Sequence, residues 1–215
     1  MKLTYLGHSA FLAEINGKKL LFDPWIIGNT SATLDINEIK SLEPDLVFIS
    51  HGHKDHGFKE AIDITKNTNA KAVGVFELVN ALKEKGGKGI GTNIGGRLNL
   101  DGVEIYVTHA QHSCPYSSPC GFVVKYERKT IYHAGDTALT KDMAILTDLF
   151  DLDIAMVPIG GHFTMGLTEL PLFNKMVKSK KYVGMHYNTF NEIGTDLNKA
   201  KQFVEIMEPG ESCDC

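Results

Sequence analysis

The order in which strand-like and helix-like segments follow one another constrains this fold more than any other feature. Residues 2–6 and 9–15 alternate apolar and polar side chains as strands do, and Asn16-Gly17 favours a tight turn back into 18–22. Asp101-Gly102 predicts a second hairpin, between 97–100 and 103–108. Strand and helix patterns alternate after each hairpin region. This order predicts an α/β sandwich of two facing sheets with helices outside, in place of a doubly wound sheet.

The other expected elements follow from hydrophobic periodicity. Residues 45–50 form a nearly continuous apolar run, which is typical of a strand covered on both faces. Further strands are expected over 72–76, 122–126, 129–133, 153–157 and 182–185, and helices over 58–66, 77–85, 138–150, 168–178 and 196–207. The two halves meet near 86–100, where nothing is typical of a free linker. We therefore expect one domain over residues 1–215.

Composition narrows the class of protein. A chain of 215 residues with 43% hydrophobic and 22% charged residues is long enough to bury a core without disulfides or a structural metal. Lys and Arg total 22 against 26 Asp and Glu, so the net charge of −4 does not attract polyanions to the molecule as a whole. No apolar run approaches the roughly 20 residues of a membrane span, and the N-terminus lacks a signal-peptide core. We expect a cytoplasmic protein with no membrane partner, and we leave a homo-oligomer open.

The four cysteines do not form a secreted disulfide framework. Cys114 and Cys120 flank a loop that contains proline and serine, whereas Cys213 and Cys215 lie at the end of the chain. We expect reduced thiols, with a Cys114–Cys120 pair as the alternative.

The segment directly after the 45–50 strand carries the strongest chemical signal. It reads Ser50-His51-Gly52-His53-Lys54-Asp55-His56-Gly57 and places four metal-ligand side chains within six residues. A turn loosened by glycine can direct His51 and His53 at one point, while Asp55 and His56 face a second point beside it. This spacing suggests two metal ions about 3.5–4 Å apart.

More distant residues would complete such a site. His112, Asp136 and His186 each follow the end of an expected strand, at the edge where loops of α/β sheets converge on ligands. A bridging Asp136 would complete one site with His51, His53 and His112. It would complete the other with Asp55, His56 and His186.

These residues, with the His51–His56 motif and Ala134-Gly135-Asp136, resemble the signature of the metallo-β-lactamase superfamily. The stretches around Gly7-His8-Ser9, 22–24, 132–137, 158–166 and 186–190 are similar to a branch of metal-dependent hydrolases near the ascorbate-6-phosphate lactonases. The resemblance spans nearly the whole chain. It implies a four-layer αβ/βα sandwich of two mixed sheets, with a dinuclear site in the cleft between the halves. Antibiotic-degrading members usually have Cys where Asp136 stands, so the resemblance disfavours penicillin hydrolysis.

The inferred ligands imply a mechanism. Two divalent ions that share a bridging water lower its pKa and hold hydroxide ready, while one ion polarises the electrophile. A shell of imidazoles and carboxylates suits Zn²⁺ or Mn²⁺, and also Fe. Asp55 and His162 are the expected catalytic residues, because His162 follows the apolar strand 153–157, where it could protonate a leaving oxygen or bind an anion. A surface or packing role for His162 is equally compatible with the sequence.

Four residues are expected around the ligands. Asp23 follows the 18–22 strand and could accept the free ring N–H of a ligand histidine, or instead cap a turn. Thr164 lies beside His162, Asn188 follows His186 in a segment that could line the substrate pocket, and His8 is either a similar second-line residue or a packing one. His109 and His133 lie within expected strands, which favours packing or supporting hydrogen bonds.

Two kinds of substrate agree with this site. Phosphoester hydrolysis, including a phosphodiesterase or nuclease acting on DNA or RNA, is our first hypothesis, since paired metals clamp the attacking and leaving oxygens. Lysines in 83–88 and 178–181 could guide a polyanion, or could be solvated surface. The alternative is a lactonase or amide hydrolase for a small substrate, with or without a phosphate group. A flavodiiron-like redox domain lacks support, because no flavin-binding domain fits in the chain.

Overall fold

The computed structural model describes residues 1–215 and contains two mixed sheets. The first sheet has seven strands in the order β13-β1-β2-β3-β4-β5-β6. Their bounds are β1 (Lys2–Gly7), β2 (Ala10–Ile15), β3 (Lys18–Phe22), β4 (Leu46–Phe48), β5 (Lys71–Val75), β6 (Gly89–Thr92) and β13 (Ser212–Asp214). Strands β1 to β3 are antiparallel, as the Asn16-Gly17 turn predicts, and β3 to β6 are parallel.

The second sheet has six strands in the order β12-β11-β10-β9-β8-β7. These are β7 (Arg97–Leu100), β8 (Val103–His109), β9 (Cys120–Tyr126), β10 (Lys129–His133), β11 (Leu152–Pro158) and β12 (Ser179–Met185). Strands β7 to β10 are antiparallel and β10 to β12 are parallel. Both halves therefore begin with a hairpin and end with parallel strands.

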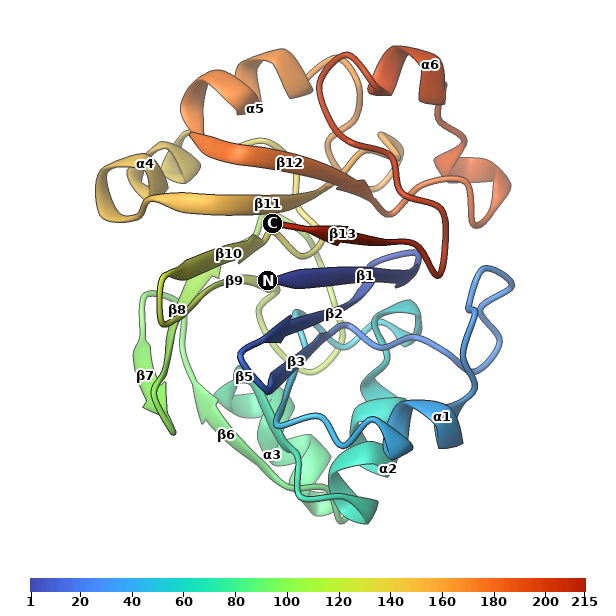
Figure 1. Ribbon diagram of the computed structural model, residues 1–215, viewed down its shortest axis with the longest axis vertical. Coiled ribbons are helices and arrows are strands. Elements are labelled where there is room, and N and C mark those ends of the chain that lie inside the picture. Colours follow the sequence, from blue (N-terminus) through green and yellow to red (C-terminus); the bar gives the residue numbers. More distant parts are fainter.

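Helices cover the outer faces of the two sheets (Figure 1). The first sheet carries α1 (Ile36–Ser41), α2 (Phe58–Asn67) and α3 (Phe76–Glu84), and the second carries α4 (Ile145–Leu149), α5 (Leu170–Met176) and α6 (Leu197–Ala200). Ile64 of α2 and Leu78 of α3 pack with Val47 of β4 in one apolar cluster. The four-layer αβ/βα sandwich expected from the sequence is confirmed.

The main core lies between the two sheets. The ring of Phe48 on β4 stacks on Phe22 of β3 at 4.7 Å and meets Phe122 of β9 edge-on at 5.2 Å. All three side chains are fully buried. Truncating such a residue to alanine costs about 3–5 kcal/mol, so this cluster holds the halves together.

The expected helix over 168–178 is limited to α5, and two other expected helices are much shorter than predicted because β-bridges capture some of their residues. The 138–150 segment forms a 3₁₀ turn, Lys141–Ala144, followed by the short α4, since Ala138 is bridged to Gln111. The 196–207 segment is helical only over α6. Beyond it, Glu205 pairs with the edge of β12 by donating to the Tyr182 carbonyl and accepting from the Gly184 amide.

The sequence patterns did not reveal α1, β6 and β13. Strand β6 comes from the glycine-rich stretch: a Cβ on Gly89 would lie 2.7 Å from the Ala72 carbonyl oxygen, so only glycine permits this approach to β5.

None of the four cysteines forms a disulfide; the Cys114 thiol donates to the Ser117 carbonyl and the Cys120 thiol to the Ser50 carbonyl. No helix is both long enough and apolar enough to traverse a bilayer.

Candidate metal centre

Residues from five loops meet at one edge of the sandwich. His51, His53, Asp55 and His56 follow β4, with a 3₁₀ turn at Lys54–His56. The other loops follow β1, β8, β10 and β12, and they contribute His8, His112, Asp136 and His186 respectively. Their potential ligand atoms form three overlapping groups, which are His51–His53–His112, His51–His56–Asp136 and His8–Asp55–His56–His186. The structure thus brings together all seven residues predicted as ligands and adds His8.

The centre of the cluster is one oxygen atom, Oδ2 of Asp136. The Nε2 atoms of His186 and His56 lie 3.0 and 3.2 Å from it. Those of His112 and His51 lie 3.7 and 3.9 Å away. One carboxylate oxygen is therefore shared by two pairs of imidazoles, which is the placement that a bridging ligand requires.

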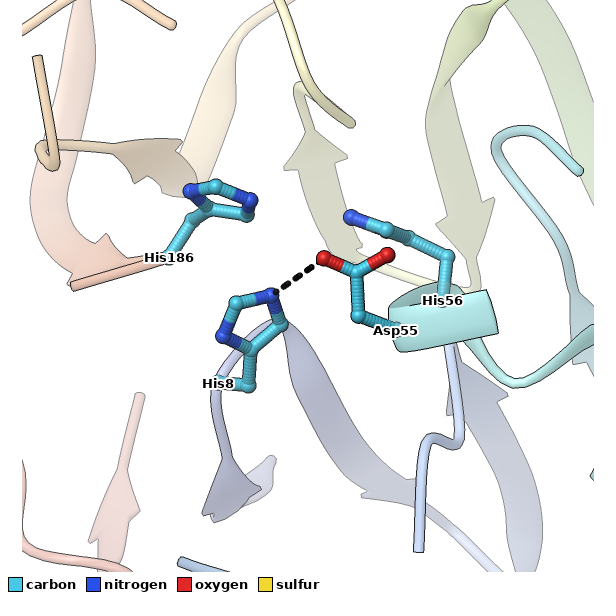
Figure 2. A group of neighbouring side chains, drawn as sticks. All are labelled: His8, Asp55, His56 and His186. Carbon is cyan, nitrogen blue, oxygen red and sulfur yellow. Dashed lines mark ion pairs between the residues drawn. The ribbon is translucent and has the colours of Figure 1, made fainter. Parts of the chain in front are cut away.

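The two sides of Asp136 differ in their donors. On one side, His51 Nε2 and His53 Nδ1 are 3.0 Å apart, and the His112 ring lies edge-on to both. On the other side, Figure 2 shows Asp55, His56, His186 and His8 directed toward a common space. There, His8 Nε2 and Asp55 Oδ2 are 3.5 Å apart.

Local backbone geometry makes this convergence feasible. Gly135 has φ +62°, and a Cβ there would collide with the Cys120 carbonyl and lie 2.9 Å from the Ser50 Cβ. Three non-glycine residues of the site, His8, Asp23 and His186, also have positive φ. Such conformations cost of order 1–3 kcal/mol each and concentrate at functional sites.

Supporting hydrogen bonds orient the histidines. His56 Nδ1 donates to Asp23 Oδ2 at 2.7 Å, so the contact expected between Asp23 and a candidate ligand is present. Asp23 also accepts from the Ser50 amide and hydroxyl, and the same hydroxyl lies 2.9 Å from His51 Nδ1. Ser50, which the sequence patterns did not single out, thereby links Asp23 to a second candidate ligand. A carboxylate behind a ligand histidine fixes its tautomer and ring orientation.

The electrostatics of the cluster suit a cation. Burial would raise the pKa of Asp136, but the charges of His56 and His186 hold that pKa well below its usual value. Burial likewise opposes ionisation of Asp55, but the charge of the neighbouring His56 lowers its pKa below the usual value. Burial lowers the pKa of His8 to about 4 and that of His51 well below normal, so both rings are neutral at pH 7. Burial opposes protonation of His56, but Asp136 and Asp23 raise its pKa well above normal. Metals bind ionised carboxylates and neutral imidazoles, so a cation bound here would replace the proton on His56.

Unpartnered polar atoms show that these residues fit a metal. His8 Nε2, His56 Nε2, His186 Nδ1 and Asp136 Oδ1 are buried without a hydrogen-bond partner. Native proteins satisfy nearly all such atoms, and each unsatisfied one costs about 1–3 kcal/mol. Bound cations would satisfy the lone pairs of His8 Nε2 and His56 Nε2, which face the other candidate ligands.

The remaining predicted residues are not part of the three ligand groups. His162 is exposed and packs edge-on against Phe163, and the Thr164 hydroxyl donates to the Met165 carbonyl. The exposed Asn188 bonds its amide to the backbone of Thr195. His109 is exposed at the end of β8, while buried His133 donates from Nε2 to the Ser9 carbonyl.

The fold and its histidine–aspartate cluster define the class of metallo-β-lactamase-like hydrolases. A model of the β-lactamase superfamily domain matches residues 2–186. A UPF0173 metal-dependent hydrolase of Pyrobaculum islandicum is 41% identical over 99% of both chains, and one of Staphylothermus marinus is 40% identical over 98% of this chain and 97% of its own. Igni18, a metallo hydrolase of Ignicoccus hospitalis, superimposes with a TM-score of 0.90 at 38% identity and covers 99% of this chain and 97% of its own. The chain therefore belongs to the metallo-β-lactamase superfamily, as a metal-dependent hydrolase of the UPF0173 family.

Proposed function

We propose that the cluster holds two divalent metal ions and that the protein hydrolyses a small organic substrate at a carbonyl ester, lactone or amide bond. The shared position of Asp136 Oδ2 among four imidazoles carries the proposal of two ions. One ion would be held by His51, His53 and His112. The other would be held by Asp55, His56 and His186, and Asp136 would bind both ions. Zn²⁺ and Mn²⁺ suit these donors best, and Fe also agrees with them.

When bound, such a pair of ions would activate a water molecule for attack and polarise the electrophile. The side chains here do not offer a competing nucleophile. The Ser50 hydroxyl donates to Asp23, and the Cys120 thiol is buried against the Ser50 carbonyl, where burial raises its pKa well above normal. Asp23 and Ser50 hold the rings of His56 and His51 in place, so that the cluster keeps its geometry through the reaction.

The surroundings of the cluster favour a small substrate with apolar parts. The Trp25 ring lies edge-on to His8 at 5.0 Å, and Phe190 lies 6.3 Å from His186. Tyr116 is exposed. Its ring lies beside the histidine loop, because a Cβ on Gly52 would be 2.7 Å from it. Aromatic side chains around a few polar groups are typical of pockets for small molecules.

The lysine stretches do not support a polymeric substrate. Residues 178–181 lie at the start of β12, whereas His186 follows its end. Residues 83–88 precede β6, which pairs in parallel with β5. Strand β5 pairs in parallel with β4, and β4 leads into His51 at its far end. Both stretches therefore lie at the ends of the strands that are opposite the cluster. A small phosphodiester is the second candidate, because two ions clamp its oxygens well and Lys54 is exposed within the histidine loop.

A substrate panel tests this proposal. Purified protein loaded with Zn²⁺, Mn²⁺ or no metal is assayed on lactones, p-nitrophenyl esters and amides, bis-p-nitrophenyl phosphate and supercoiled plasmid. We expect metal-dependent turnover of lactones or esters. Turnover confined to bis-p-nitrophenyl phosphate would transfer the assignment to phosphodiesters, and plasmid cleavage would restore the nuclease hypothesis. The role of His162 as a proton donor is tested in the same panel with His162→Ala, which should lose activity mainly on substrates with poor leaving groups.

A further inference from the structure

We propose that His8 is itself a metal ligand through Nε2, so that one of the two metal positions has three imidazoles and two carboxylates. This inference rests on the proposed function, in which the cluster holds two ions. The position would comprise His8, Asp55, His56, His186 and Asp136 (Figure 2). The other position, made by His51, His53, His112 and Asp136, has only four protein donors.

The backbone fixes where His8 lies. It occupies the turn between β1 and β2 with φ +58°, and its side chain is fully buried. Its carbonyl oxygen accepts from the His186 amide at 2.8 Å and from the Tyr5 hydroxyl at 3.0 Å. The Trp25 ring and the His186 ring, at 5.0 and 4.4 Å, enclose the imidazole. The ring therefore has little freedom to turn away from the cluster.

The hydrogen bonds of Thr189 indicate the tautomer of His8. His8 Nδ1 is 2.9 Å from Thr189 Oγ1, and that hydroxyl donates to the Tyr187 carbonyl at 3.3 Å. A hydroxyl has one proton to donate, and Thr189 donates it to the Tyr187 carbonyl. The Thr189 oxygen therefore accepts a hydrogen bond from Nδ1–H of His8. The neutral ring then has its lone pair on Nε2.

That lone pair faces another electron-rich atom. Nε2 lies 3.5 Å from Asp55 Oδ2, and it has no hydrogen-bond partner although it is buried. Two lone pairs directed at each other repel unless a cation lies between them. Donors about 2.1 Å from one ion, at the angles of roughly 90–120° found in five-coordinate sites, lie roughly 3.0–3.6 Å apart, a range that includes this separation. If His8 Nε2 and Asp55 Oδ2 bind the same cation, both their separation and the absence of a hydrogen-bond partner for Nε2 are explained.

The unequal donor sets imply unequal metal preferences. Zn²⁺ is held by four ligands in most protein sites, which suits the His51–His53–His112 side. Five donors, two of them carboxylates, suit ions of higher coordination number such as Mn²⁺ or Fe²⁺. We therefore expect a chain offered Zn²⁺ and Mn²⁺ together to bind Mn²⁺ preferentially on the His8 side.

Cobalt-substituted protein tests the ligand role directly. In protein loaded with two Co²⁺, each ligand imidazole with a ring N–H gives a strongly shifted, exchangeable proton resonance. We expect His8→Gln to lose one such resonance and to bind its second Co²⁺ at least about 10-fold more weakly. The exposed His109→Gln serves as the matched control and should keep both the resonances and the affinities.

Thr189→Val provides a variant that leaves the cluster intact. If His8 is a ligand, losing the acceptor of its Nδ1–H shifts one cobalt-affected resonance and leaves the others unchanged. The inference is overturned if two Co²⁺ bind and neither His8→Gln nor Thr189→Val alters these resonances, which would make His8 only a support for Asp55. Failure of the unaltered protein to bind two ions would instead refute the proposed function.

Discussion

The backbone amide of His186 donates a hydrogen bond to the carbonyl oxygen of His8 at 2.8 Å. His8 follows β1 of the first sheet and His186 follows β12 of the second, so this bond joins the two halves within the cluster. His133 makes a parallel link from β10 to the Ser9 carbonyl. Because the ligand candidates come from both halves, metal binding and the packing of one sheet on the other are expected to stabilise each other.

Asp136→Asn removes the shared charge while preserving side-chain size. We expect it to lower metal-dependent kcat/KM by at least about 100-fold and to lose at least one bound ion per chain, because both positions depend on this carboxylate. Elemental analysis of the loaded protein, together with steady-state kinetics, measures both effects. Retention of two ions would refute the bridging role.

Asp23→Asn removes the charge behind His56 without touching the space between the ligands. Outer partners of this kind typically contribute 10–100-fold to metal affinity, and we expect a loss of about that size. Titration with a competing chelator measures it. The matched control is Asp153→Asn, which changes a buried aspartate in β11 that pairs with Lys180 and should leave metal affinity unchanged.

Gly135→Ala tests the tight turn that delivers Asp136. The added Cβ meets the Cys120 carbonyl at a positive φ, so we expect a loss of about 2–4 kcal/mol in the free energy of unfolding. Urea denaturation measures this loss. Gly17→Ala in the first hairpin has φ +85° but open space, and a loss of only about 1 kcal/mol is expected there. Equal losses in the two variants would show that the collision at Gly135 is relieved by small shifts.

Neutralising lysines should not affect catalysis. We expect the double variant Lys83→Gln/Lys178→Gln to keep kcat/KM, and its dependence on ionic strength, within about twofold for a charged substrate, because both side chains lie far from the cluster. Rate measurements across a salt series test this. A reduced salt dependence would indicate that these lysines guide an anionic substrate.

The Asp153–Lys180 pair predicts how stability changes with pH. Burial opposes ionisation of Asp153, but Lys180 at 2.8 Å and the Thr130 amide at 2.9 Å lower its pKa below the ordinary value. Since the folded pKa is the lower one, the contribution is complete above about pH 5 and is lost as pH falls through the folded pKa. Asp153→Asn should therefore lower stability by about 1–2 kcal/mol at pH 7, and by less near pH 3. Urea denaturation at both pH values checks this; a constant difference would contradict it.

Short-range patterns in the sequence determined the hairpins, the buried strands and the ligand-rich loop. Asn16-Gly17 favours a tight turn because both residues adopt positive φ. The residues from His51 to His56 lie close together because they occupy the single loop that follows β4. The residues that follow expected strand ends, His112, Asp136 and His186, were also accessible from the sequence, because parallel strands bring such residues to a common edge.

Only the tertiary structure decided which residues lie in the ligand cluster and which lie outside it. Whether buried His8 faces the cluster depends on a turn in one sheet and on Thr189 in the other, and no local pattern encodes that contact. The 138–150 and 196–207 segments have helical periodicity, yet neighbouring strands and loops capture part of each. The physical reason is common to both cases: contacts between residues distant in sequence outweigh local preferences of about 1 kcal/mol or less.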